Sequence, residues 1–156
     1  MIELAKILAL VSVLGTAVVY GTDVFCAVVQ RPALAVVDDR ALVAVMGNVH
    51  RYGDRRMPIP GVLGGVAAIA SAAVFAVAGQ WAQTITAALA VAILLAWIVL
   101  YVRVSAPINR QLTQAAASRQ VPPNARVLQS NWDRIINARA ILQGLALTAL
   151  CLTLIA

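Results

Sequence analysis

Four long and largely apolar stretches limit how this chain can fold. They cover residues 4–29, 61–79, 84–103 and 135–155. A helix needs about 20 mostly apolar residues to cross the hydrocarbon core of a bilayer, which is about 30 Å thick. Hydrophobic residues make up 62% of the chain, which exceeds the roughly 45–50% that is usual in soluble domains. The sequence therefore predicts a small multi-pass membrane protein.

The apolar stretches are continuous rather than alternating, which favours helices over a transmembrane β-barrel. We expect an all-α fold, an integral membrane up-and-down four-helix bundle, formed as a single domain by residues 1–156. The four stretches and their connections occupy these residues, so a functional site is expected between the helices or in the adjoining loops. The first stretch is predicted to be a retained span, because it is long and no clear small-residue cleavage site follows it.

The basic residues predict how the bundle is oriented. The net charge is +6, and the basic residues are Lys6 and eleven arginines. Five arginines lie in the first connection and six in or beside the third, whereas the second connection, residues 79–83, has none. This is the positive-inside pattern, so the first and third connections are predicted to be cytoplasmic and both termini to be outside. The arginines then face anionic lipid headgroups, and nucleic acid is not the expected partner. A bacterial-type inner membrane or plasma membrane is the expected location.

The first connection is predicted to contain an amphipathic helix from Asp39 to about Tyr52. Asp38 or Asp39 is a suitable N-cap, and apolar residues then recur at helical spacing: Leu42, Val45, Met46 and Val49. We expect this helix to lie along the membrane or under the bundle, and to be ended by Gly53 and the proline-containing segment 57–60. In the third connection, a helix is predicted after Pro107 and a turn at residues 121–124.

Asp23 is the main ionisable candidate within a span. It belongs to a polar stripe on one face of the first stretch and lies about two turns from the predicted cytoplasmic end. A charged group at the centre of a span costs about 2.5–3.5 kcal/mol on insertion scales, so it is expected to face the bundle interior and to have a function. An ion pair with an arginine of a neighbouring helix, such as Arg139, is the alternative.

His50 is the only histidine and the only side chain whose usual pKa suits proton transfer near neutral pH. One histidine argues against a multi-histidine metal site or a bis-histidine haem within one chain. A single axial haem ligand, or ligation shared across a dimer, stays open. We expect a pocket at one level of the bundle, where polar groups meet apolar walls. Its predicted residues are Tyr20, Asp23, His50, Tyr101, Asn109, Trp132, Asn137 and Arg139.

Three short motifs are similar to those of a known family. Residues 21–25 lead to Pro32 at the end of the first span, and Pro107-Ile108-Asn109 follows the third. Trp132-Asp133 precedes Arg139 at the start of the last span. In these places the chain resembles the anthrone oxygenase-like family of small four-span membrane proteins, most of which have no known function. The resemblance covers nearly the whole chain.

The resemblance implies a cofactor-independent monooxygenase. Such an enzyme would insert oxygen from O₂, its co-substrate, into the activated methylene of a lipophilic polycyclic phenol, without a metal or flavin. It would need a base, donors for the oxyanion and a flat apolar slot. His50 or Asp23 would then be the base, Arg139 and Asn109 would stabilise the oxyanion, and Trp132 and Tyr20 would form the walls.

Two other functions stay open from the sequence. One is a non-enzymatic accessory or scaffold subunit that binds a lipid, a quinone or a partner helix through the small residues of the second span. The other is a haem- or quinone-linked redox protein that uses His50. In each case membrane lipids and a lipophilic small molecule are expected partners, and a homo-oligomer or a membrane-protein partner is compatible with the sequence.

Overall fold

The computed structural model describes residues 1–156, and it is entirely helical. The helical segments are α1 (Ile2–Phe25), the π-helical η1 (Cys26–Gln30), α2 (Arg31–Ala35), α3 (Asp39–Arg56), α4 (Pro58–Val77), α5 (Trp81–Leu100), the π-helical η2 (Tyr101–Ser105), α6 (Ala106–Ser118) and α7 (Ala125–Ile155). They join into four long rods, Ile2–Ala35, Asp39–Val77, Trp81–Ser118 and Ala125–Ile155, each long and apolar enough to cross a membrane. The predicted all-α fold with four long apolar helices is confirmed.

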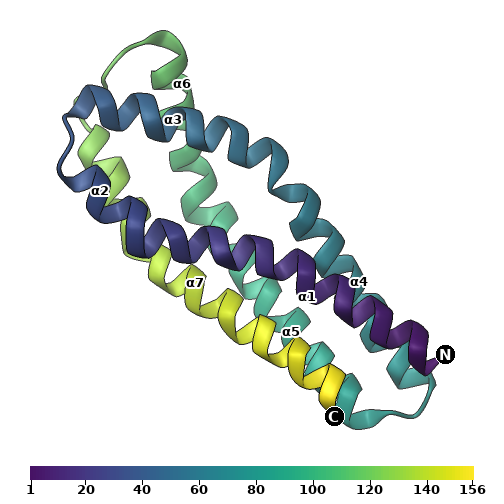
Figure 1. Ribbon diagram of the computed structural model, residues 1–156. Coiled ribbons are helices and arrows are strands. Elements are labelled where there is room, and N and C mark those ends of the chain that lie inside the picture. Colours follow the sequence, from purple (N-terminus) through teal and green to yellow (C-terminus); the bar gives the residue numbers. More distant parts are fainter.

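The four long helices pack as a ring (Figure 1). α1 contacts α4 and α7, and α5 contacts the same two helices. Both termini and the turn between α4 and α5 lie at one end of the molecule, while α2, α3 and α6 lie at the other. The ring therefore has two distinct ends, and the segments between the predicted spans gather at one of them.

The two ends differ in how they are packed. Eleven buried apolar residues from η1, α2, α3, α6 and the first half of α7 form one core at the α3/α6 end. The other apolar cluster is much smaller and consists of Ala68, Ala90, Ala149 and Leu150. Around it, large apolar side chains such as Leu14, Val66 and Leu89 are more than half exposed. Extended apolar surfaces of this kind are rare on soluble monomers, so the two ends are suited to different surroundings.

The helix predicted in the first connection is present, but it is longer and differently placed. Asp38 caps it, accepting a hydrogen bond from the Ala41 amide at 2.7 Å. It continues past Tyr52 to Arg56, and only Met57 separates it from α4. α3 packs against α6 and extends the rod of α4. The prolines do not redirect the chain, because proline is tolerated in the first turn of a helix.

Both π-helical segments end two residues before a proline. η1 precedes Pro32, and η2 precedes Pro107. A proline inside a helix lacks an amide hydrogen and its ring clashes with the carbonyl four residues earlier. The wider π turn relieves this clash, so each rod passes its proline without breaking. The predicted helix after Pro107 and the turn at residues 121–124 are both present.

Candidate functional site

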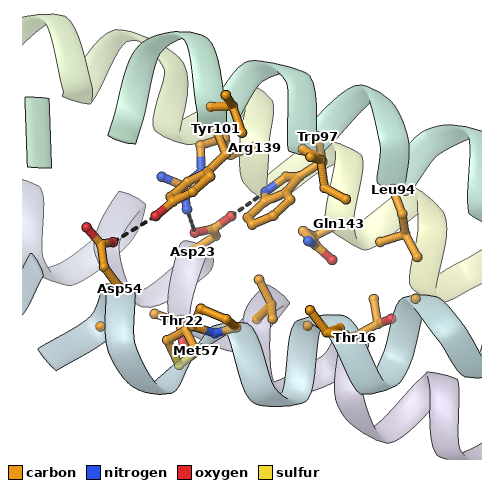
Figure 2. A pocket seen from close by; sticks show the side chains of 18 of the residues that line it. Thr16, Thr22, Asp23, Asp54, Met57, Leu94, Trp97, Tyr101, Arg139 and Gln143 are labelled. Carbon is orange, nitrogen blue, oxygen red and sulfur yellow. Dashed lines mark hydrogen bonds and ion pairs between the residues drawn. The ribbon is translucent and has the colours of Figure 1, made fainter. Parts of the chain in front are cut away.

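A cavity of about 510 Å³ lies inside the ring, near the α3/α6 end (Figure 2). Residues from α1, α3, α4, α5, α6 and α7 line it, and its walls are mainly apolar. Polar side chains are concentrated at one end, where Asp23, Asp54, Tyr101 and Arg139 approach one another. A mainly apolar cavity with a few convergent polar groups is the usual form of a small-molecule site.

A buried ion pair joins α1 to α7 at this polar end. Arg139 Nη2 donates to Asp23 Oδ1 at 2.6 Å, and the two side chains are 8% and 2% exposed. Arg139 Nη1 donates to Ser105 Oγ at 2.9 Å. Trp97 Nε1 donates to the other carboxylate oxygen of Asp23 at 2.9 Å. Both oxygens of Asp23 therefore have a donor, which is what a buried carboxylate requires.

Three aromatic rings surround the guanidinium of Arg139. Its Cζ lies 5.3 Å from the ring centre of Trp97, 5.6 Å from that of Tyr101 and 5.5 Å from that of Trp132. The rings of Trp97 and Tyr101 are themselves stacked, 5.6 Å apart and 7° from parallel. The negative faces of aromatic rings attract cations within about 6 Å. The rings and Asp23 together hold the charge in an otherwise apolar place.

A second network connects α3 to α6 and α7. Asp54 Oδ1 accepts hydrogen bonds from Tyr101 Oη at 2.8 Å and from Asn109 Nδ2 at 2.9 Å. Asn109 Oδ1 in turn accepts from Trp132 Nε1 at 3.1 Å. The two networks meet at Tyr101 and Trp132, which belong to the second network and also face Arg139. The polar end is therefore a connected structure built by six of the helical segments, α1, α3, α5, η2, α6 and α7.

His50 lies beside these networks but outside their hydrogen bonds. It is 5% exposed, and its ring centre is 5.6 Å from that of Trp132, at an angle of 51°. Its Nε2 is buried and has no hydrogen-bond partner. α3 lies outside the four predicted spans, and burial there lowers the pKa of His50 to about 4. His50 is therefore neutral at pH 7, and it is one of the residues that line the cavity.

Two further buried polar atoms on the cavity wall have no partner, Arg139 Nε and Gln143 Oε1. Buried polar groups in folded proteins are nearly always hydrogen-bonded, so an unpaired one calls for an explanation. Here the unpaired atoms are the Arg139 Nε donor, the Gln143 amide oxygen and the His50 imidazole nitrogen, and all three residues line the same cavity. Together they could recognise a ligand that carries both hydrogen-bond acceptors and a donor.

Six of the eight predicted site residues line this cavity: Asp23, His50, Tyr101, Asn109, Trp132 and Arg139. The alternative that we kept open, an ion pair between Asp23 and Arg139, is also present. Tyr20 and Asn137 do not line the cavity. Tyr20 packs on Gly144 of α7, where an added Cβ would lie 3.1 Å from Tyr20 Cε2. Asn137 is exposed, because two residues of helix rotate it by about 200° from Arg139.

Four residues that were not among the predicted site residues complete the site: Asp54, Trp97, Ser105 and Gln143. Each lies four positions from a predicted residue, namely His50, Tyr101, Asn109 and Arg139 respectively. Residues four apart lie on the same face of a helix. Extending each predicted site residue by one turn in both directions would have found them.

No three or more histidine, cysteine, aspartate or glutamate side chains are grouped so that they could hold a metal ion. No family model matches the chain, and neither a curated protein nor a solved structure shows significant similarity to it.

Proposed function

We propose that this is a multi-pass membrane protein in which parts of α1, α4, α5 and α7 span the bilayer. Four helices of sufficient length and apolarity, and the exposed apolar side chains around them, support this proposal. The arginines of α2, α3, α6 and the start of α7 lie at one end of the ring, and under the positive-inside rule this supports a cytoplasmic position for that end. The membrane would be a plasma membrane or a bacterial inner membrane.

We further propose that the cavity binds a flat, lipophilic aromatic molecule with phenolic or carbonyl oxygens and oxidises it with O₂. The observation that carries this proposal is that three residues lining an apolar cavity, His50, Arg139 and Gln143, each have a buried polar atom without a hydrogen-bond partner, namely Nε2, Nε and Oε1 respectively. The apolar walls suit the rings, and the unpaired atoms suit the oxygens. The resemblance to anthrone oxygenase-like proteins agrees with this class of substrate.

The reaction would proceed from a proton transfer. A base removes a proton from the activated methylene, and the resulting carbanion reduces O₂ and forms a carbon–oxygen bond. Loss of the second methylene proton, with cleavage of the O–O bond, then gives the carbonyl product and one water, so one substrate and one O₂ are consumed. Charge on the ring oxygen would be stabilised by Arg139, which lines the cavity and whose Nε has no hydrogen-bond partner.

His50 is the base that we propose. It is neutral at pH 7 and its Nε2 is free, whereas both oxygens of Asp23 already accept hydrogen bonds. Asp23 would instead hold Arg139 in place. A pKa near 4 makes His50 a weak base in the empty site, but an anion formed beside it would raise that pKa. Proton transfer and charge stabilisation would thus be coupled.

We expect His50→Gln to reduce turnover of an anthrone by about 10²- to 10⁴-fold, the usual contribution of a general base. Oxygen uptake and formation of the quinone, measured on purified protein in detergent, test this. Asn137→Ala is the matched control, because Asn137 is exposed and outside the cavity. Turnover by His50→Gln equal to that of the wild type would remove His50 as the base, and no turnover by the wild type would contradict the oxygenase proposal.

A second candidate function is a non-catalytic binding subunit, because the Asp23–Arg139 pair is already complete without a ligand. Such a protein would bind the same class of molecule and leave it unchanged. Quenching of tryptophan fluorescence by an anthrone, without oxygen uptake, would favour this function. A Soret absorption band in the purified protein would instead favour a haem protein.

A further inference from the structure

The cavity is not closed on all sides. Six apolar lining residues are also between 46% and 63% exposed. They are Val62, Val66 and Ile69 of α4, and Leu95, Ile98 and Val102 of α5 and η2. Their side chains therefore belong both to the cavity wall and to the accessible surface of the molecule. All six are apolar and all lie along the seam between α4 and α5.

Glycines on α4 leave this seam open. Gly61 and Gly65 both line the cavity. A Cβ added to Gly65 would meet no atom within 4 Å, and one added to Gly61 would meet only Val19 Cγ2, at 3.8 Å. Elsewhere on the same helix, by contrast, an added Cβ on Gly64 would lie 3.1 Å from the Thr16 amide. Gly64 therefore serves close packing, whereas Gly65 leaves empty space beside the opening.

The opening lies along the part of α4 and α5 nearest the polar end. The lining residues of α4 run from Pro58 to Ile69, which corresponds to about 17 Å at a rise of 1.5 Å per residue. A hydrocarbon core is about 30 Å thick, so the seam would extend over roughly half of it. Figure 2 shows the polar end of the cavity at Asp54 and Tyr101, and Leu94 at the opposite, apolar end.

We propose that the ligand reaches the cavity sideways from the bilayer, between α4 and α5, and that Gly65 keeps this path open. The occupant of the seam is a molecule dissolved in the hydrocarbon, with its polar group toward Arg139 and His50 and its apolar part toward Leu94. A water-soluble ligand would have no need of a path whose exposed rim is formed by valine, leucine and isoleucine side chains. The inference rests on the proposed membrane insertion but does not depend on oxygenation.

Tryptophan fluorescence tests this path without knowledge of the ligand. Trp97 and Trp132 line the cavity, and the third tryptophan, Trp81, is 66% exposed near the far end. A Trp81→Phe protein in phosphatidylcholine vesicles would report on the cavity. The probe is phosphatidylcholine with brominated acyl chains, and acrylamide is the water-soluble counterpart.

Two variants test the role of the opening. Gly65→Leu fills the opening, and Gly21→Leu is the matched control. An added Cβ on Gly21 also meets nothing within 4 Å, and Gly21 does not line the cavity.

We expect brominated lipid to quench the Trp81→Phe protein, and this quenching to be largely lost with Gly65→Leu but kept with Gly21→Leu. Ile98→Phe narrows the same opening from α5, and the same loss is expected there if Gly65→Leu does not fold. Equal quenching in the Gly65, Ile98 and Gly21 variants would overturn the proposal, as would strong quenching by acrylamide together with weak quenching by brominated lipid. If His50→Gln loses turnover while brominated lipid still quenches its tryptophan fluorescence normally, the catalytic step is impaired and ligand entry between α4 and α5 is not.

Discussion

Replacing Arg139 with methionine is expected to lower the free energy of unfolding by about 3–5 kcal/mol, the usual cost of removing one partner of a buried ion pair. The Asp23 carboxylate would remain 2% exposed and would keep only the Trp97 hydrogen bond. The aromatic rings around the guanidinium would also lose their cation. Reversible unfolding of the purified protein in detergent, followed by circular dichroism, measures the loss.

Arg134→Met is the matched control, because Arg134 is an exposed arginine on the same helix. We expect it to change stability by no more than about 0.5 kcal/mol. Adding Asp23→Asn to Arg139→Met should recover part of the loss, with a coupling energy of about 0.5–3 kcal/mol. If Arg139→Met were as stable as Arg134→Met, the ion pair would have no structural role.

The second large effect is expected at Gly15, where α1 crosses α4. A Cβ on Gly15 would lie 2.6 Å from the Pro60 carbonyl oxygen and 2.9 Å from Gly64 Cα. Both neighbours are backbone, so neither can rotate away. We expect Gly15→Ala to destabilise the bundle by about 1–3 kcal/mol, the range for overpacking, although alanine is the better helix former. The same detergent unfolding assay applies.

Gly21→Ala provides the opposite expectation on the same helix. Its Cβ would meet nothing within 4 Å, so the gain in helix propensity of roughly 0.5–1 kcal/mol should appear. The sign of the change therefore distinguishes the two positions. Equal effects of the two substitutions would show that α1 and α4 do not meet at this crossing.

The long helices could be predicted because each rests on a local property. Continuous apolar runs and the Asp38 cap act over a few residues, and the structure has both the long helices and the cap. The orientation of α3 could not be predicted in this way. It depends on Gly47, where an added Cβ would collide with Leu112 and Ala116 of α6. A contact between segments more than sixty residues apart leaves no periodic signal in either segment.

The candidate site was predictable to a similar extent. Depth and helical face were sufficient to bring Asp23, Asn109 and Arg139 to one cavity. The identity of each hydrogen-bond partner could not be predicted, since no feature of the sequence distinguishes Asp54 from Asp38 or Asp39. Asn137 was misplaced because rotation around the helix decides which of two nearby polar residues faces inward.

The π turns η1 and η2 have a consequence for how such a chain can change by insertion and deletion. A π turn holds one residue more than the α-helical turn that it replaces, so loss of one residue from η2 could restore a regular helix. Because the extra residue is held within the wider turn, the residues after it would keep their helical face, and Asn109 would still face Asp54 and Trp132. Loss of one residue from a regular α-helical part of the same rod would instead rotate everything after it by about 100° and separate the polar networks. In this protein the π turns are therefore the places in the rods where a residue can be lost while the polar groups stay aligned.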